Sequence, residues 1–215
     1  MRKIIGLAIM LLVGAVASQA TVVLTFSGFQ QPYENILNYY NGGFGGSGSG
    51  PGPNYGITFG SDALALPNGP GSNVSNEPQG STASMIFLTG TGDIMNVPAG
   101  FTNGFSFFYS AAYIYTGTVS VYDGLNGTGN VLASLFLPLN GSYCGTLRYS
   151  CWTAVGVTFP GTALSADFSG TANYIAFSNV TLGSAIAGTP EPGTMFMFGS
   201  GVVGLAGLIR RKLRV

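Results

Sequence analysis

The sequence predicts an all-β protein whose central part is an antiparallel β-sandwich of the jelly-roll type. Short apolar runs recur roughly every 8–15 residues, and several of them alternate apolar with polar residues, as half-buried strands do. Asn-Gly, Asp-Gly, Pro-Gly and Gly-Ser steps separate these runs and are typical of turns. The stretch 21–188 is long enough to bury one substantial hydrophobic core.

The first expected strand covers residues 21–26, where Val22, Leu24 and Phe26 share one face. Further strands are expected at residues 85–88, 104–110, 118–122, 131–137, 153–159, 163–168 and 174–180. The runs 85–88 and 131–137 are almost continuously apolar, which is typical of strands buried on both faces.

One strand pattern and one helix pattern carry more specific expectations. Phe105, Phe107 and Tyr109 lie two residues apart, so the sequence predicts that they point into the core together. Residues 32–40 are the only stretch that favours a helix, with Glu34 in its first turn.

Two segments rich in Gly, Ser and Pro, residues 42–56 and 67–80, are predicted to be long surface loops. Loops of this length are either ordinary surface connections or functional segments, and the sequence leaves both open. Tyr39, Tyr40 and Tyr55 flank the first loop and are candidate contacts for a sugar or a protein ligand. Packing in the core is the alternative role for these rings.

Cys144 and Cys151 are the only cysteines, and an oxidising compartment would join them in a disulfide. The bond would close a loop of about eight residues and stabilise the fold by roughly 2–3 kcal/mol. A redox-active pair is the alternative, but the spacing is not Cys-x-x-Cys.

Charge and composition exclude several functions. The chain has seven basic residues, seven acidic residues and no His, which excludes Ser-His-Asp and Cys-His catalysis and His-ligated zinc. Residues 21–188 have one base, Arg148, so their net charge is 1 − 6 = −5, and no basic patch for nucleic acid exists. Their six acids are Glu34, Asp62, Glu77, Asp93, Asp123 and Asp167.

No catalytic motif surrounds these acids, although six carboxylates leave open a hydrolase that uses two of them. The segment 123–130 has oxygen donors and glycines but a single carboxylate, Asp123, so it predicts a hairpin loop and not a calcium site. We therefore expect no resident metal and no cofactor.

Residues 1–20 have the three zones of a secretory signal peptide. Arg2 and Lys3 are positively charged, residues 4–17 are apolar, and Ser18 and Ala20 supply the small residues of a cleavage site after Ala20. An uncleaved membrane anchor is the alternative interpretation.

Residues 189–215 form a second targeting segment. They begin with the tripeptide Pro190-Glu191-Pro192, which its two prolines hold extended. The uncharged run 194–209 is predicted to cross the membrane as a helix; it is just short of the usual length, and flanking residues and local thinning of the bilayer can cover the difference. The terminal bases should stay in the cytoplasm and place residues 21–188 outside. These bases are Arg210, Arg211, Lys212 and Arg214.

This combination of tripeptide, apolar span and basic end resembles the PEP-CTERM protein-sorting tail of Gram-negative bacteria. The resemblance implies recognition by exosortase, a membrane protease-transpeptidase. It also implies release or transfer to the cell surface, often in bacteria that make extracellular polysaccharide. An ordinary tail anchor, which would leave an unprocessed periplasmic protein, is the alternative.

The body of the chain resembles that of PEP-CTERM proteins more loosely, through the stretches 104–110, 121–129 and 170–175 among others. This resemblance implies a shared β-sandwich but no particular activity. Such relatives often have acids where this chain has Ser27, Ser178 and Asn179, which makes a bound calcium ion doubtful. The sequence thus predicts a non-enzymatic surface or extracellular-matrix protein that associates with polysaccharide or adheres to other proteins.

Overall fold

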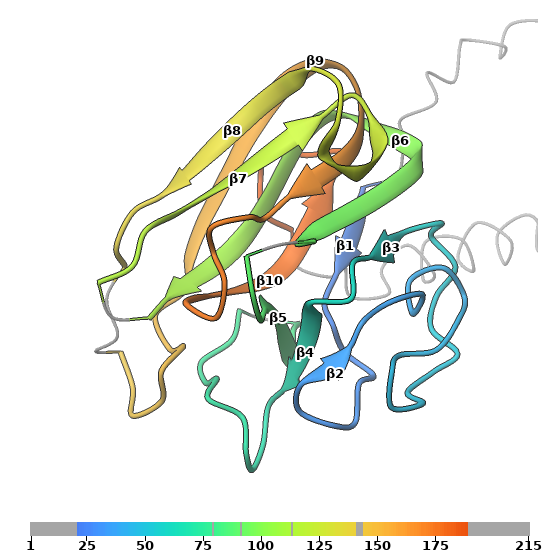
Figure 1. Ribbon diagram of the computed structural model, residues 1–215. Helices are drawn as coiled ribbons and strands as arrows, with labels where there is room; N and C mark the ends of the chain where they lie inside the picture. Colours follow the sequence, from blue (N-terminus) through green and yellow to red (C-terminus); the bar gives the residue numbers. More distant parts are fainter. Residues whose placement is uncertain (1–20, 79, 91, 113, 141–143, 189–215) are drawn as a thin grey trace, which may run out of the picture.

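The computed structural model describes residues 21–78, 80–90, 92–112, 114–140 and 144–188, and these residues form an all-β fold (Figure 1). The predicted signal peptide, sorting tripeptide, apolar span and basic cluster lie outside the described residues. None of the helices within the described part is long and apolar enough to cross a membrane. The strands are β1 (Val22–Leu24), β2 (Glu34–Asn35), β3 (Thr58–Phe59), β4 (Ala63–Pro67), β5 (Ala83–Phe87), β6 (Ile94–Ala111), β7 (Gly117–Tyr122), β8 (Val131–Leu137), β9 (Thr153–Asp167) and β10 (Ile175–Leu182), with one 3-10 turn, η1 (Leu125–Gly127).

The strands form one hydrogen-bonded sheet in the order β2-β4-β5-β10-β6-β9-β7-β8, with β1 paired to β10 and β3 paired to β6. The pairings between these strands are antiparallel. In Figure 1 the β7–β8 hairpin lies at the upper left, and β2, β3 and β4 lie at the lower right.

Strands β6 and β9 are long and pair with each other along most of their length. Ile94–Asn96 pair with Ser165–Asp167, and Asn103–Tyr109 pair with Thr153–Phe159, with register shifts between these two parts. At the shift, Gly100 adopts a φ of 73°, a left-handed conformation that a residue with a Cβ rarely takes. The first half of β6 joins β3, and the second half joins β10, so the sheet bends back on itself around a common core.

The core between the two parts of the sheet is dominated by aromatic rings. Phe105 and Phe107 are fully buried and Tyr109 almost fully, which confirms that these three residues point inward. Phe168 and Phe177 add an edge-to-face pair with ring centroids 4.9 Å apart. Aromatic pairs with this geometry contribute about 0.5–1.5 kcal/mol beyond the area they bury.

A smaller core covers the outer face of β4, β5 and β10. Leu66 and Ile86 point outward there and are covered by Tyr149 and by the half-buried Trp152. The Tyr149 hydroxyl donates to the Asn173 carbonyl at 2.8 Å, and Trp152 Nε1 donates to the Ser75 carbonyl at 2.9 Å. The segment that supplies both side chains begins at the disulfide between Cys144 and Cys151, which confirms the expected bond.

The structure also corrects several expectations. The helix predicted at residues 32–40 is wrong, because Tyr33 and Leu37 have φ values of 62° and 48°, which no right-handed helix accommodates. Part of this stretch is instead β2, which pairs with β4. Strand β8 is not buried on both faces: it ends the strand order, and Val131 and Phe136 are 54% and 64% exposed. The two strands predicted at 153–159 and 163–168 are one continuous strand, β9.

Candidate functional site

The side chain of Glu34 accepts hydrogen bonds from the glycine-rich loop 42–56, which backbone hydrogen bonds also hold in place. Its Oε1 accepts hydrogen bonds from the backbone N–H groups of Ser47 and Ser49 at 2.9 and 3.0 Å. Its Oε2 accepts one from the Ser49 hydroxyl at 2.6 Å. Glu34 is only 1% exposed, so these bonds to a charged acceptor form in a low-dielectric environment, where they are strong.

Two of the three candidate tyrosines beside this loop are packed inside the protein. Tyr40 is buried, and its hydroxyl accepts the N–H of Phe26 at 2.7 Å. Tyr39 is also buried and donates to the Ser27 carbonyl at 3.2 Å. Burial raises the pKa of both hydroxyls, and the nearby charge of Glu34 raises that of Tyr39 further. A ligand contact for these two residues stays a prediction, and their described contacts are those of core residues.

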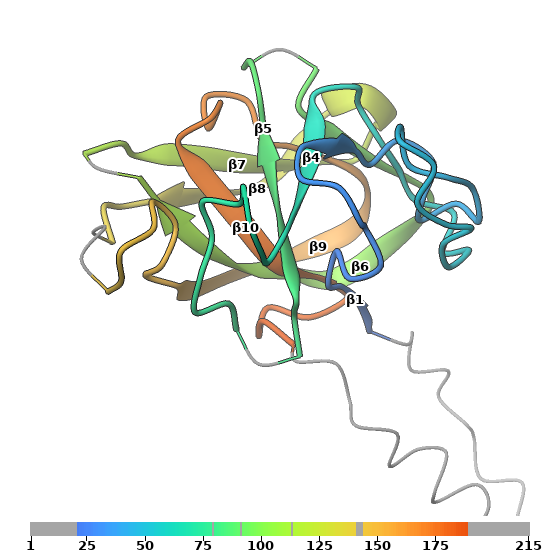
Figure 2. The same cartoon turned by 90° about the horizontal axis from the view of Figure 1, so that it is seen from below.

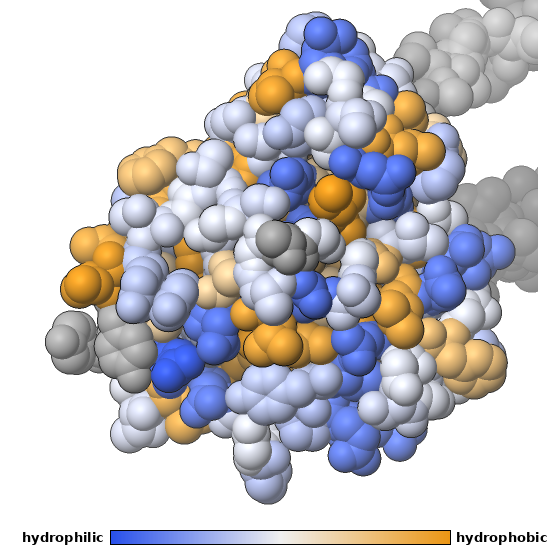
Figure 3. All heavy atoms as spheres, in the orientation of Figure 1, coloured by the Kyte–Doolittle hydropathy of each residue, from blue (hydrophilic) through white to orange (hydrophobic). Residues whose placement is uncertain are grey.

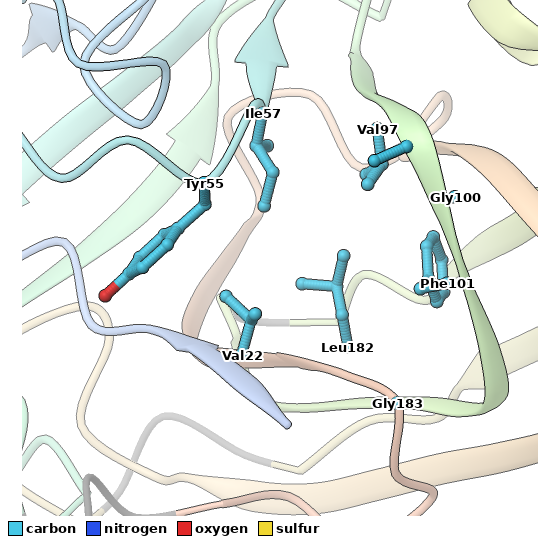
Figure 4. A pocket seen from close by; sticks show the side chains of 9 residues that line it. Val22, Tyr55, Ile57, Val97, Gly100, Phe101, Leu182 and Gly183 are labelled. Atoms are coloured by element: carbon cyan, nitrogen blue, oxygen red, sulfur yellow. The ribbon is translucent and has the colours of Figure 1, made fainter. Parts of the chain in front are cut away.

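Tyr55 differs from its two neighbours, because it is 45% exposed and stacks on Tyr40 with ring planes 13° apart. It lines a cavity of about 270 Å³ between the start of β3 and the middle of β6 (Figure 4). The figure shows Ile57, Val97, Phe101, Val22 and Leu182 arranged around the cavity, with Tyr55 to one side. Ala99, Gly100 and Gly183 complete its wall, so the lining contains no charged residue.

A second exposed aromatic feature lies away from the predicted site residues. Tyr115 and Tyr174 stack with ring centroids 3.6 Å apart and are 38% and 40% exposed. The pKa of Tyr115 is raised, chiefly by the hydrogen bond with the Tyr174 side chain, and the positive charge of Arg148 offsets only part of this rise. No local sequence pattern signals this pair, because the two residues come from separate loops that only the folded sheet brings together.

The Tyr115–Tyr174 pair is placed by backbone and side-chain contacts among three loops. The N–H of Ala112 donates to the Tyr174 carbonyl at 2.6 Å, which fixes the loop before β10 against the end of β6. The Tyr149 bond to Asn173 adds a third segment. That segment carries Arg148, the only base of residues 21–188.

Five of the six acids of residues 21–188 have hydrogen-bond partners. None of the six lines the cavity beside Tyr55. Asp123 binds the backbone and side-chain N–H groups of Asn130, which lowers its pKa and closes the expected hairpin loop. Glu34 is held by the two serines of the glycine-rich loop. The remaining three pairs are Asp62 with Thr89, Glu77 with Asn68, and Asp167 with Ser169.

Asp93 is the exception among these acids. It is fully buried, and within the described part of the chain neither carboxylate oxygen has a hydrogen-bond partner. Burial, together with the charges of Asp62 and Asp167, raises the pKa of Asp93 to about 6. The described residues contain no group of three acidic or Cys side chains placed to hold a metal ion.

Residues 189–212 match the model of the PEP-CTERM protein-sorting motif. This match confirms the resemblance seen in the tail, and the motif indicates an exported protein. The disulfide is consistent with a location outside the cytoplasm. The sequence has no significant match among curated proteins.

Several solved structures have a distantly similar fold. A carbohydrate-binding module of Cellvibrio mixtus lichenase 5A is 9% identical over 60% of this chain and 92% of its own, with a TM-score of 0.37. The K1 cleaved adhesin domain of Lys-gingipain from Porphyromonas gingivalis is 16% identical over 77% and 98%, with a TM-score of 0.38. A Bacillus subtilis arabinoxylan arabinofuranohydrolase is 16% identical over 59% of this chain but 26% of its own, with a TM-score of 0.39.

Proposed function

We propose that this chain is an exported, non-catalytic protein that its PEP-CTERM tail delivers to the cell surface or extracellular matrix of a Gram-negative bacterium. The match of residues 189–212 to the sorting motif carries the proposal. The signal-like residues 1–20 and the disulfide support the same route. The uncharged lining of the cavity supports binding over hydrolysis by a carboxylate pair.

In this scheme the signal peptide is removed after Ala20, and the run 194–209 holds the chain in the inner membrane. The terminal cluster from Arg210 to Arg214 stays in the cytoplasm. Exosortase then acts at Pro190-Glu191-Pro192 on the outer side and detaches the domain from its anchor.

Intact mass of the protein from each cell fraction of the native host tests this route. We expect a species that begins at Thr21, ends near Pro190–Pro192 and lies outside the inner membrane. A species that still carries Arg210–Val215 and stays in the inner membrane would contradict sorting and leave a tail-anchored periplasmic protein.

We propose further that the released domain associates with neutral polysaccharide through the stacked pair Tyr115–Tyr174. Solvent-facing aromatic rings offer a flat apolar face to the C–H groups of a sugar, and the tyrosine hydroxyls supply hydrogen bonds at its edge. The net charge of −5 over residues 21–188 disfavours polyanions. Figure 3 shows apolar residues in separate patches among polar ones, a surface that suits contacts with hydrated chains.

Binding of the released protein to a panel of neutral and acidic polysaccharides tests this role. Tyr115→Ala and Tyr174→Ala should each weaken binding by about tenfold, because stacking of this kind is worth roughly 1–2 kcal/mol. Tyr55→Ala tests the cavity as the alternative site. Phe136→Ala is the matched control, because this aromatic ring is also exposed but lies on β8. Wild-type binding by Tyr115→Ala and Tyr174→Ala would contradict the stacked pair as the binding site, and no binding by the wild type would contradict the polysaccharide role.

A further inference from the structure

The segment that leads from β10 to the sorting tail is held against the sheet near both of its ends. The N–H of Gly183 donates to the Gly104 carbonyl at 3.0 Å, and the Ser106 hydroxyl donates to the Ser184 carbonyl at 2.8 Å. The N–H of Gly188 donates to the Thr181 hydroxyl at 2.9 Å. We call residues 183–188 the exit segment.

Gly104 and Gly156 lie on β6 and β9, and their missing side chains make room for the exit segment. A methyl group on Gly156 would overlap the Ala185 carbonyl, and it would also lie 2.7 Å from the Cβ of Ser106 on the paired strand β6. A methyl group on Gly104 would lie 2.5 Å from Ala185 N and 2.8 Å from the Ser184 carbonyl carbon. Real Cβ atoms do not approach other atoms so closely, so a side chain at either position would displace the segment. Gly104 and Gly156 therefore form a dock.

The docked segment is held by few interactions. Its residues are half-buried or exposed, and Ile186 is 80% exposed, so the segment buries little apolar surface. Three hydrogen bonds to the domain and close backbone packing hold it in place. Segments of this kind detach locally at a much smaller cost than global unfolding.

The sorting tripeptide follows the exit segment closely in the sequence. Thr189 alone separates Pro190 from Gly188, which is bonded to Thr181 of β10, so at most about 7 Å of extended chain separates the tripeptide from this bonded residue. Val22 of β1 pairs with Leu182 of β10, so the N-terminal end of the domain lies beside the start of the exit segment. A protease that binds its substrate as an extended peptide needs free chain on both sides of the cleavage site.

We propose that the exit segment can detach from the domain, and that it must leave the Gly104–Gly156 dock before the membrane protease can engage Pro190-Glu191-Pro192. This inference rests on the proposed sorting function. The rate of cleavage then scales with the fraction of molecules in which the exit segment is detached. Detachment frees residues 183–188, which lengthens the accessible chain by about 20 Å.

Gly156→Ala in the full-length chain is the direct test. The added methyl group disfavours docking, and amide hydrogen exchange at Gly183 and Gly188 should become about tenfold faster or more. The rate at which the native host removes residues 210–215 should rise by a similar factor. Ser106→Ala, which removes one hydrogen bond and adds no bulk, should have a smaller effect in the same direction. Gly90→Ala is the matched control, because its methyl group would make only an ordinary contact, 3.6 Å from Ala172.

A second variant separates access from damage to the domain. Six Gly/Ser residues inserted after Gly188 supply free chain while the dock stays intact, and they should accelerate cleavage as much as Gly156→Ala. Combining the insertion with Gly156→Ala should give no further gain, because both changes remove the same obstacle. If amide exchange is faster but cleavage is unchanged, or if the insertion has no effect, the exit segment does not control access of the protease to the tripeptide. A wild type that is never cleaved would instead overturn the sorting function itself.

Discussion

Two loops of the domain, residues 42–56 and 144–151, are held in place in different ways, and they lie on opposite sides of it (Figure 2). Residues 144–151 are closed by a disulfide, and Tyr149 from this segment packs into a small apolar core. The loop 42–56 has no covalent link and instead surrounds one buried carboxylate, Glu34, with hydrogen-bond donors. Backbone hydrogen bonds such as Gly45 N–H to the Ser49 carbonyl and Gly52 N–H to the Gly43 carbonyl hold the same loop. A low-complexity sequence can therefore be ordered without a covalent link, by its own backbone bonds together with one buried side-chain acceptor.

The largest effect is expected where the carboxylate is removed. Glu34→Ala leaves the Ser47 and Ser49 N–H groups without their acceptor and should lower the free energy of unfolding by about 3–5 kcal/mol. Urea unfolding measures this loss, and exchange of the amides in residues 42–56 should show that it is local to this loop. Glu77→Ala is the control, because Glu77 accepts one bond from the Asn68 side chain, and its replacement should cost less than about 1 kcal/mol. Equal losses for the two variants would mean that Glu34 does not organise the loop.

Loss of the disulfide should destabilise the protein somewhat less than loss of the Glu34 carboxylate. Replacing Cys144 and Cys151 together by Ser should cost roughly 2–3 kcal/mol, because the short ring restricts the unfolded chain only modestly. A reducing agent should reproduce this loss in the wild type, and the stability difference between the wild type and Glu34→Ala should stay the same after reduction. If reduction also speeds amide exchange in residues 42–56, the two loops are coupled, and the contrast between them is wrong.

Asp93 offers a second comparison with Glu34. It is as deeply buried, but no N–H or O–H group of the described residues donates a hydrogen bond to its carboxylate. Its pKa is raised from 3.8 to about 6 in the folded protein, so the folded state holds the proton more tightly than the unfolded state. This contribution to stability is complete below about pH 4 and is lost as the pH rises through 6. The charged form then destabilises the fold by roughly 1–3 kcal/mol.

The variant Asp93→Asn isolates this effect. At pH 8 it should unfold at a higher temperature than the wild type, and the difference should vanish near pH 4. Thermal unfolding of both proteins between pH 4 and pH 8 measures the difference directly. A constant difference across this range would show that Asp93 has an ordinary pKa in the folded protein.

The same contrast explains which parts of the structure the sequence can predict. Alternation locates β7, and an almost continuous apolar run locates β8, almost to the residue, because both patterns are local in the sequence. It also predicts the inward face of Phe105, Phe107 and Tyr109. The disulfide follows from having two cysteines in an exported segment.

The features that the sequence does not predict depend on contacts between distant segments. Glu34 has the pattern of an acid in the first turn of a helix, but its carboxylate is taken by donors 13 and 15 residues away. Tyr39 and Tyr40 lie beside a glycine-rich stretch in the sequence and are nevertheless buried. No local pattern predicts the stacking of Tyr115 on Tyr174, which meet only once β10 lies beside β6. The edge position of β8 likewise follows from strand order and not from composition.

The smallest effect concerns Ser49, the one residue that contacts Glu34 through both its backbone and its side chain. Ser49→Ala removes the 2.6 Å bond to Oε2 and the 3.1 Å bond that its hydroxyl accepts from the N–H of Gln30. The N–H of Ser49 still reaches Oε1, so the loss should be about 1–2 kcal/mol, below that of Glu34→Ala. Ser47→Ala is the control, because Ser47 donates through its backbone and its side chain is exposed, and it should change stability by less than about 0.5 kcal/mol. If urea unfolding gives Ser49→Ala the full loss of Glu34→Ala, the hydroxyl and not the pair of backbone N–H groups orders the loop.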